Sequence, residues 1–374
     1  MNRIPIVGEL APGFHAAALD GNPRYAFDTA AGRWIVMLFL GQAGKPEFAP
    51  VLASLEENRD LFDDANVCFF GVTIDPADAA AGRIAHQLPG IRWFLDYDQA
   101  VSKTYGALGD DGTYQPYWLL LDRRQRVFLR APLSDGPQLL AECRRRAREP
   151  EAMPAPVLVA PRILSPDLCR RLIELHERQG GEESGFMRDV GGVTRTIVDH
   201  HHKRRTDCTI ADEALLTALK VSLFHVLRPL VQRAFQFDPT RIERWIVACY
   251  DGAAGGHFRP HRDNTTKGTA HRKFAVTINL NAEEYEGGDL CFPEFGPQTY
   301  RAPTGGAVVF SCSLLHEARP VTKGRRYAFL PFLYDDAGAR LRERNLAHVS
   351  PELQNYRSGL PAEDAPQDPE VTSP

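Results

Sequence analysis

The sequence has few of the features that direct a protein to a membrane, to secretion or to a polyanion. Its 374 residues carry 44 Lys and Arg against 48 Asp and Glu, a formal net charge of −4 at pH 7. The excess of positive charge that attracts nucleic acid or anionic lipid is therefore missing. No uninterrupted apolar run approaches the roughly 18 residues of a membrane span, and the opening MNRIPIVGELAPGF lacks the apolar core of a signal peptide. We expect a cytoplasmic protein that binds neither nucleic acid nor a membrane.

A cysteine framework is missing as well. The seven cysteines are odd in number and dispersed, and no pair has CxxC spacing, which is typical of reduced thiols rather than of disulfides. A content of 43% apolar and 25% charged residues is that of an ordinary globular protein, and the length predicts two domains. The cysteines are Cys68, Cys143, Cys169, Cys208, Cys249, Cys291 and Cys312.

The first domain, residues 1–150, alternates strand-like and helix-like segments. The apolar run WIVMLFL at 34–40 has the length and composition of a strand that is covered on both faces. Alternating segments in the order β-α-β-α-β-β-α predict a three-layer α/β domain. The segments that follow the first strand are a helix at 47–62, a strand at 67–75, a helix at 79–88, a strand pair at 117–129 and a helix at 135–148.

The strings GELAPGF, SKTYGAL and YWLLLDRRQRVFL in this domain resemble the peroxiredoxin branch of the thioredoxin fold, over roughly residues 5–145. Peroxiredoxins carry their reactive cysteine just after the strand that corresponds to 34–40, where a helix N-terminus stabilises the thiolate. Here that segment reads GQAGKPEFAP, without Cys, Ser or Thr, and the nearest cysteine, Cys68, lies inside the next strand. We therefore expect a non-peroxidatic domain that serves docking or dimerisation, with a homodimer through it as one outcome.

A different pattern follows. The proline-rich residues 151–161 are expected to form a linker. The segment 165–180 has Ser165 as N-cap, proline at the first helical position and glycine at its end, which predicts a helix. A second helix is expected at 211–227, broken or restarted at Pro229.

Short strands separated by turns occupy the chain from about residue 242 onward. Helices followed by six or more short strands predict a β-sandwich or jelly roll with the helices against one face, in a second domain at 162–340. Residues 341–374 are expected to contain a C-terminal helix and a disordered, acidic, proline-rich tail.

The stretch GGHFRPHRDN at 255–264 crowds His257, His261 and Asp263 together, by chance on a polar loop or as part of a metal site. Residues two apart on a strand project to the same side, so His261 and Asp263 can bind one cation such as iron(II) or zinc. About fifty residues later His316 follows a buried strand, and Arg326 lies ten residues beyond it. This order and spacing are those of the facial triad of non-haem iron(II) oxygenases.

Three strings around these residues resemble the prolyl 4-hydroxylase group of iron(II)/2-oxoglutarate dioxygenases: ACYDGAAGGHFRPHRDN, INLNAEEYEGGDLCFPE and LHEARPVTKGRRYAFLPF, within residues 155–340. The resemblance implies a double-stranded β-helix in which His261, Asp263 and His316 bind Fe(II). It also implies 2-oxoglutarate and O₂ as cosubstrates, with ascorbate as a candidate addition, and no catalytic residue beyond the metal ligands. The implied reaction is hydroxylation of a C–H bond, favoured at a prolyl residue of a protein or peptide, with release of succinate and CO₂. A small-molecule hydroxylase and a non-catalytic two-domain binding protein are the alternatives.

The resemblance also gives expectations for the 2-oxoglutarate pocket. Arg326 would bind the distal carboxylate, because a guanidinium fork matches a carboxylate and stays charged when it is buried. Arg325 becomes the rival if the register slips by one residue. Tyr250 is a candidate hydrogen-bond partner of the cosubstrate, or a core tyrosine bonded to the backbone. Asn279 is a weaker candidate for the same pocket.

The run HHHKRR at 200–205 cannot direct three consecutive histidines at one ion. It is either a solvated loop or a basic segment that faces the substrate. In the second case Arg205 is the expected substrate contact.

Overall fold

The computed structural model describes residues 3–19, 21–149 and 153–360. The chain divides into two compact units, one made of Met1–Ala155 with the short segments Leu290–Thr299 and Leu314–Glu317, and the other made of the rest. The strands in those two segments pair within a sheet of the second unit and are described with it. The two are called the N-terminal unit and the C-terminal unit below.

The N-terminal unit is built on a five-stranded sheet in the order β5-β4-β3-β6-β7. The strands β3, β4 and β5 are parallel, whereas β6 and β7 run antiparallel to their neighbours. The strands are β1 (His15–Ala16), β2 (Tyr25–Ala26), β3 (Trp34–Gly41), β4 (Val67–Thr73), β5 (Ile91–Leu95), β6 (Tyr117–Leu121) and β7 (Val127–Ala131). The helices are α1 (Ala49–Glu57), α2 (Pro76–Ala80), α3 (Ala100–Thr104) and α4 (Gly136–Arg148).

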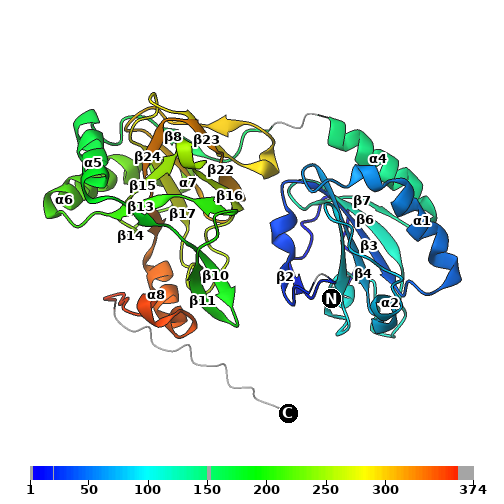
Figure 1. Cartoon of the computed structure of the whole chain (residues 1–374). Helices are drawn as coiled ribbons and strands as arrows, with labels where there is room; N and C mark the ends of the chain where they lie inside the picture. Colours follow the sequence, from blue (N-terminus) through cyan, green and yellow to red (C-terminus); the bar gives the residue numbers. More distant parts are fainter. Residues whose placement is uncertain (1–2, 20, 150–152, 361–374) are drawn as a thin grey trace, which may run out of the picture. The chain divides into compact units, whose positions relative to one another are not determined.

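Both faces of this sheet are covered, which explains why β3 is apolar throughout. Alternate residues of β3, such as Val36 and Leu38, pack with α1 and α4, which lie together in Figure 1. The residues between them, such as Met37, pack with α3 and with the N-terminal segment. The predicted three-layer α/β domain is confirmed.

Two details of that domain differ from the prediction. The helix expected at 79–88 is wrong: α2 covers only Pro76–Ala80, starting at the N-cap Asp75, whose side chain accepts a hydrogen bond from the amide of Ala77. It ends before Gly82, whose φ of +63° is outside the helical range. The element order also contains β5 and α3, which were not in the predicted series of segments.

The C-terminal unit contains two larger sheets. The major sheet has the order β14-β25-β17-β24-β15-β13-β9, and β21 joins it between β17 and β8; the minor sheet has the order β12-β16-β22-β19-β20. This is the predicted jelly roll. The strands of the major sheet are β8 (Leu158–Ala160), β9 (Glu182–Glu183), β13 (Thr206–Thr209), β14 (Arg241–Glu243), β15 (Ile246–Asp251), β17 (Phe274–Asn279), β21 (Ala307–Ser311), β24 (Arg325–Phe329) and β25 (Phe332–Tyr334). Those of the minor sheet are β12 (Lys203–Arg204), β16 (His257–His261), β19 (Leu290–Cys291), β20 (Thr299–Tyr300) and β22 (His316–Ala318). Two two-stranded sheets are the hairpin of β10 (Phe186–Val190) with β11 (Val193–Ile197) and the pair of β18 (Glu286–Gly287) with β23 (Val321–Lys323).

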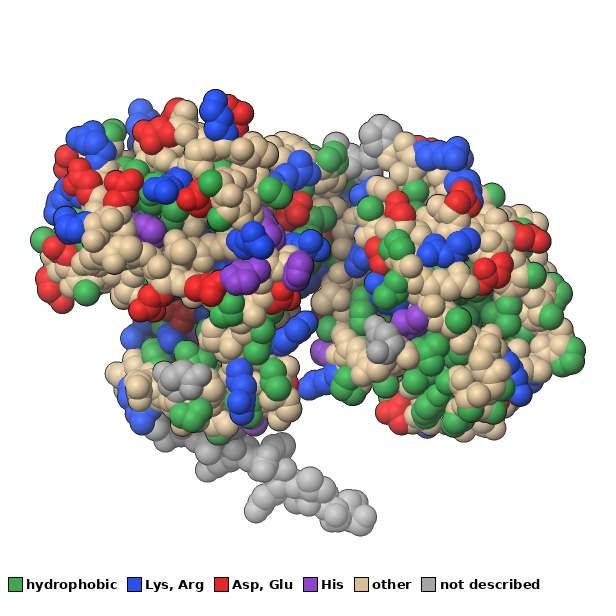
Figure 2. Space-filling model, in the orientation of Figure 1, with side chains coloured by type: hydrophobic (Ala, Val, Ile, Leu, Met, Phe, Trp, Pro, Cys, Tyr) green, Lys and Arg blue, Asp and Glu red, His purple; other side chains and the backbone are tan. Residues whose placement is uncertain are grey.

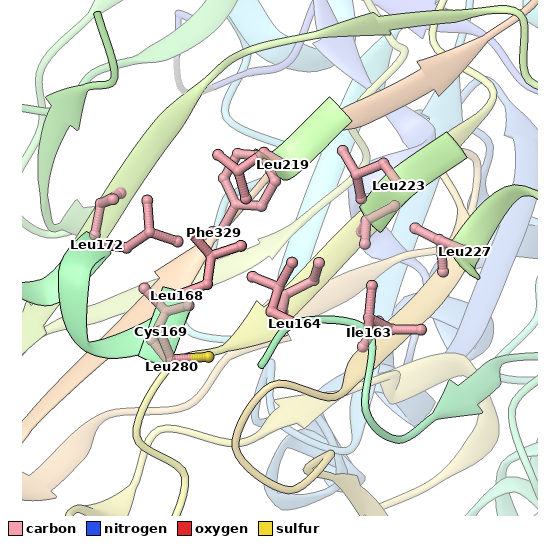
Figure 3. Packing of buried hydrophobic residues seen from close by; sticks show 14 of the residues in the cluster. Ile163, Leu164, Leu168, Cys169, Leu172, Leu219, Leu223, Leu227, Leu280 and Phe329 are labelled. Atoms are coloured by element: carbon pink, nitrogen blue, oxygen red, sulfur yellow. The ribbon is translucent and has the colours of Figure 1, made fainter. Parts of the chain in front are cut away.

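Helices pack against the outer face of the major sheet. The helix α5 (Pro166–Gln179) begins at Ser165, whose side chain accepts a hydrogen bond from the amide of Leu168, as the sequence predicts. Leucines of α5 and of the next helix form one apolar cluster with the sheet. Figure 3 shows this cluster, with side chains from both helices gathered beside Phe329 of β24.

The next helix is not broken at Pro229. It runs as α6 (Glu213–Ser222), a π-helical turn η5 (Leu223–Leu227) and α7 (Arg228–Phe235). The wider turn accommodates a proline, which has no N–H to donate and needs room for its ring. This continuous helix, Glu213–Phe235, is long and apolar enough to cross a membrane by length and composition. Its leucines at 215, 219, 223 and 227 nevertheless lie in the apolar cluster, the pattern of an amphipathic core helix.

The end of the predicted linker and the start of the predicted C-terminal helix need correction. The last part of 151–161 forms β8, which pairs with β21 in the major sheet, so residues 158–160 belong to the fold of the C-terminal unit. The helix α8 (Asp336–Arg344) begins before residue 341. The first residues of the expected linker, 151–152, and the expected disordered tail at 361–374 lie outside the described residues.

Acidic and basic side chains are intermixed on the face shown in Figure 2, in line with the small net charge. All seven cysteines are buried and unpaired by disulfides. Burial raises the pKa of the Cys68 thiol to about 11 and that of Cys143 to about 12. Neither cysteine is therefore the exposed, acidic thiol that reacts with peroxide.

The full-length protein is expected not to consume hydrogen peroxide with dithiothreitol as reductant. A thiol with a pKa near 11 is ionised in on the order of one molecule in 10⁴ at pH 7, and only the thiolate is the nucleophile. Peroxide can be followed colorimetrically, with an active peroxiredoxin as the positive control. Consumption that disappears in Cys68→Ser would show that the buried thiol is reactive after all.

Candidate metal centre

Two neighbouring strands of the minor sheet bring three potential metal ligands together. His261 is the last residue of β16, Asp263 follows it, and His316 is the first residue of β22. One ligand atom from each lies within 4.8 Å of the others. The side chain of His261 is 15% exposed and that of Asp263 11%, whereas His316 is buried. The three residues predicted from the sequence thus form one partly accessible cluster.

Backbone carbonyls orient both imidazoles. The Nδ1 atom of His261 lies 2.8 Å from the carbonyl oxygen of Arg259, and Nδ1 of His316 lies 3.1 Å from that of Leu314. A carbonyl only accepts, so each Nδ1 donates to it and each Nε2 is the ring nitrogen left to bind a metal. The Nε2 atom of His261 is 3.7 Å from Oδ1 of Asp263. Two neutral imidazoles and one carboxylate fit a borderline divalent cation such as iron(II), and such hydrogen bonds orient metal-binding histidines generally.

His257, the third polar residue of the crowded stretch, does not join the cluster. Its Nδ1 lies 2.7 Å from the carbonyl of Gly255, and its Nε2 lies 3.3 Å from the carbonyl of His201. Both ring nitrogens thus face carbonyl oxygens, and no lone pair is directed at the triad.

Aromatic side chains lie beside the two histidine ligands. The ring of Phe258 stacks on that of His261 with centroids 3.4 Å apart, and Phe292 lies 6.2 Å from His316. His202 lies against Phe186 and Phe258, with ring centroids 4.5 and 5.5 Å away. The rings of Phe258 and Phe292 thus form an apolar border beside the two histidine ligands.

The major sheet carries the residues expected to hold the cosubstrate. Tyr250 on β15 is paired in register with Arg326 on β24, so both side chains lie on the same face. Arg326 is 2% exposed, and its guanidinium lies 5.0 Å from the centre of the Tyr250 ring. Its Nε and Nη1 atoms are buried and have no hydrogen-bond partner among the described residues. A buried guanidinium in that condition fits an anionic ligand, since unpartnered buried donors are costly.

Asn279 lies on the same face, on β17, which is the next strand after β24 in the sheet. It is paired with Ala328 of β24, and Ala328 is also paired with Ala248 of β15. Its Nδ2 donates to the carbonyl of Ala302 at 2.7 Å, and its buried Oδ1 has no partner within the described part of the chain. Ala328 and Ala248 lie between Asn279 and Asp207 of β13 in this row of the sheet. Their short side chains leave space on the inner face for the longer polar side chains beside them.

Arg325 points to the other face of β24. It is exposed and forms an ion pair with Asp251, with Nε and Oδ2 2.9 Å apart. It lines a groove of about 730 Å³ together with His176, Cys249 and Tyr327, and none of the three triad residues borders that groove. The structure therefore places Arg326 on the inner side of the sheet and Arg325 outside.

Arg205 is buried in a polar network rather than in an exposed segment. It donates to the Tyr250 hydroxyl at 3.2 Å, to Ser184 Oγ at 2.9 Å and to Asp207 Oδ2 at 2.7 Å. Burial raises the pKa of Asp207, but Arg205 and Arg244 outweigh it and hold the carboxyl ionised. Burial lowers the pKa of Lys203 to about 5, so its amine is neutral at pH 7.

The run HHHKRR is therefore neither a uniform loop nor a metal site. His200 and His201 are exposed, His202 packs beside Phe258, and Lys203 is buried. Sequence reasoning missed the roles of Lys203 and Arg244 in the network. An Arg-x-Asp pattern at 205–207 could have suggested an ion pair on one strand face, but nothing local indicates Arg244.

Comparisons with known proteins agree with this geometry. Residues 245–334 match the model of the 2OG-Fe(II) oxygenase superfamily, and residues 7–129 match that of the AhpC/TSA family. A PKHD-type hydroxylase of Verminephrobacter eiseniae is 30% identical over 159 residues, 37% of this chain and 66% of that protein. A PKHD-type hydroxylase of Delftia acidovorans is 28% identical over 222 residues, 56% of this chain and 92% of that protein.

Among solved structures, a prolyl hydroxylase from Trichoplax adhaerens, in complex with a hypoxia inducible factor oxygen degradation domain peptide fragment, is 19% identical. That match covers 50% of this chain and 86% of the other, with a TM-score of 0.41. The chain spans between 50% and 66% of the length of the first curated relatives it matches. The family matches and the clustered triad agree on the same part of the sequence. Residues 7–129 are thus similar to the AhpC/TSA family, without the reactive cysteine, and residues 245–334, which hold the triad, are similar to the 2OG-Fe(II) oxygenase superfamily.

Proposed function

We propose that the chain is an Fe(II)- and 2-oxoglutarate-dependent dioxygenase that hydroxylates a prolyl residue of a protein or peptide and releases succinate and CO₂. The observation that carries the proposal is a pair of groups in one domain. One is the triad, with ligand atoms within 4.8 Å of one another, and the other is the buried guanidinium of Arg326, whose Nε and Nη1 have no partner among the described residues. 2-Oxoglutarate requires both, because its keto acid end chelates a metal and its distal carboxylate needs a positively charged partner.

The triad residues hold the metal. Nε2 of His261, Nε2 of His316 and a carboxylate oxygen of Asp263 are the three donors, and the carbonyls behind each Nδ1 keep the lone pairs directed inward. Bound Fe(II) would supply the activation of O₂ that couples decarboxylation of 2-oxoglutarate to oxidation of the substrate. Three protein ligands leave the remaining positions of the metal for the cosubstrate and O₂.

Arg326 and Tyr250 bind the distal carboxylate of 2-oxoglutarate. Nε and Nη1 of Arg326 are buried donors without a protein partner, and a planar guanidinium matches a carboxylate better than a lysine would. The Tyr250 oxygen accepts a hydrogen bond from Arg205, so its own proton remains available for the cosubstrate. Asn279 and Ala328 border the same row of the sheet.

Hydroxylation as the reaction is supported by the relatives that are named PKHD-type hydroxylases. The prolyl substrate follows from the resemblance of the three motif strings to the prolyl 4-hydroxylase group. Anaerobic titration of the protein with Fe(II) and 2-oxoglutarate tests the proposal directly, because the chelate is expected to give a weak visible charge-transfer band. A folded protein that binds Fe(II) and 2-oxoglutarate without this band, or does not release succinate in air, would refute it.

His261→Ala and His316→Ala should each abolish succinate formation and iron binding, because each removes one ligand of an open site. The melting temperature of the metal-free protein should change little. His257→Ala is the matched control on the same strand and should retain iron, since both of its ring nitrogens face carbonyls. Iron content measured after gel filtration gives the result. Retention of one equivalent of iron in both triad variants would show that the ligands are wrongly assigned.

Arg326→Leu should raise the 2-oxoglutarate concentration for half-maximal turnover far more than it raises the Fe(II) requirement. Leaving the carboxylate of a buried charge pair without its partner costs about 3–5 kcal/mol, on the order of 10²–10⁴-fold in affinity. Arg325→Leu should change the 2-oxoglutarate requirement by less than about twofold, because surface ion pairs contribute little. The opposite ranking would mean that the other arginine binds the cosubstrate.

A further inference from the structure

Arg244 has an unusual backbone between β14 and β15. Its φ is +74°, in the left-handed region that residues with a Cβ occupy at a cost. The two strands on either side pair with different partners, Glu243 with Phe332 and Val247 with Phe329, so the turn between them is fixed from both ends. The fold thus holds a strained arginine in one defined place, which is a reason to ask what its side chain does there.

The Arg244 guanidinium lies on the inner face of the major sheet. Its Nη2 donates to Oδ2 of Asp207 at 3.2 Å. Asp207 is paired in register with Ala248, which is itself paired with Ala328, two residues from Arg326. Arg244 therefore shares a face with Tyr250 and Arg326, the pair assigned to the cosubstrate, but lies on the far side of the two alanines.

The two arginines that bind Asp207 differ in how many of their N–H donors remain free for a ligand. Arg205 is 2% exposed at its side chain and uses three acceptors, the oxygens of Tyr250, Ser184 and Asp207. The side chain of Arg244 is 26% exposed. Among the described residues, its guanidinium donates a hydrogen bond to Asp207 alone. Its guanidinium lies 5.4 Å from the centre of the Phe332 ring, which holds the plane in place. Arg244 is thus anchored at one nitrogen and retains donors that reach solvent.

The charges on this face do not balance. Asp207 carries one negative charge against the two guanidinium groups, and Lys203 beside them adds none at pH 7. Burial and Arg205 lower the pKa of Arg244, whereas the carboxylates of Asp207 and Asp263 raise it. Asp263 belongs to the triad and would share its charge with a bound cation, so one surplus positive charge remains on this face, apart from Arg326.

We propose that Arg244 is a specificity-determining residue that binds a carboxylate of the substrate, and that the substrates are acidic peptides. The inference rests on the proposed function and names the substrate class of the same site. An anchored, partly desolvated guanidinium makes charge-assisted hydrogen bonds that an exposed one does not. An acidic side chain near the oxidised residue would neutralise the surplus charge and set the orientation of the peptide.

Peptide binding measured without turnover tests the proposal. The protein is loaded with Zn(II), which the same nitrogen and oxygen ligands bind and which has no redox chemistry, and with 2-oxoglutarate. Two pools of acetylated, amidated pentapeptides with a central proline are titrated by calorimetry. The flanking positions are drawn from Asp, Glu, Gly and Ala in one pool, and from Asn, Gln, Gly and Ala in the other. The acidic pool is expected to bind on the order of 10-fold more tightly.

Arg244→Leu should remove this preference, and Arg325→Leu, the matched substitution on the other face of β24, should keep it. Arg244→Gly should also remove it while remaining folded, because glycine adopts a φ of +74° without strain and Asp207 keeps Arg205. Equal binding of the two pools to the wild-type protein, or a preference that survives in both Arg244 variants, would overturn the proposal. Succinate release by the wild-type enzyme with Fe(II) is measured separately, so failure of the proposed function is distinguishable from failure of this inference.

Discussion

The register between β15 and β24 is the constraint on which the site depends. It places Tyr250 and Arg326 on the inner face and leaves Cys249 and Tyr327 on the outer one. A slip by one residue would bury Arg325 and turn the Arg326 guanidinium outward. The outer residues oppose that slip, because Cys249, Tyr327 and Phe329 pack in the apolar cluster under the helices (Figure 3). Helix packing on one side of the sheet thus fixes which arginine lies on its inner face.

How far the site could be predicted follows from how local each signal is. The pair His261 and Asp263 could be predicted because side chains two apart on a strand share a face, and His316 because a buried strand precedes it. The choice between Arg325 and Arg326 could not be made, since it depends on pairing with β15, about seventy-five residues earlier in the chain. Arg244 gave no signal at all, because its position depends on a backbone angle that propensities do not reveal.

The same distinction explains the errors in the fold. The helix α5 was predicted from a cap, a proline and a glycine that all act within one turn of its ends. The strand β8 was predicted to be linker because prolines flank it in the sequence. Its strand partner β21, which shows that it belongs to the sheet, lies about 150 residues later. The prediction of a helix at 79–88 was wrong because α2 ends before Gly82, whose backbone is not helical. That prediction used the spacing of apolar residues and did not take the glycine into account. Local signals thus give element type, and distant pairing decides the rest.

The N-terminal unit shows that a fold can persist without the residue that its chemistry requires. The loop that lacks the cysteine is held by the buried carboxylate of Asp78, whose Oδ2 accepts hydrogen bonds from the amide of Ala43 and the hydroxyl of Thr73. Loop residue Ala43 packs in the apolar cluster on one face of the sheet, whereas its neighbour Gln42 is exposed. The loop is thus held by Asp78 and Ala43 and needs no thiol for its place in the fold. In the C-terminal unit the opposite holds, since Nε and Nη1 of Arg326 are buried without a hydrogen-bond partner among the described residues, a condition that costs stability unless a ligand satisfies them.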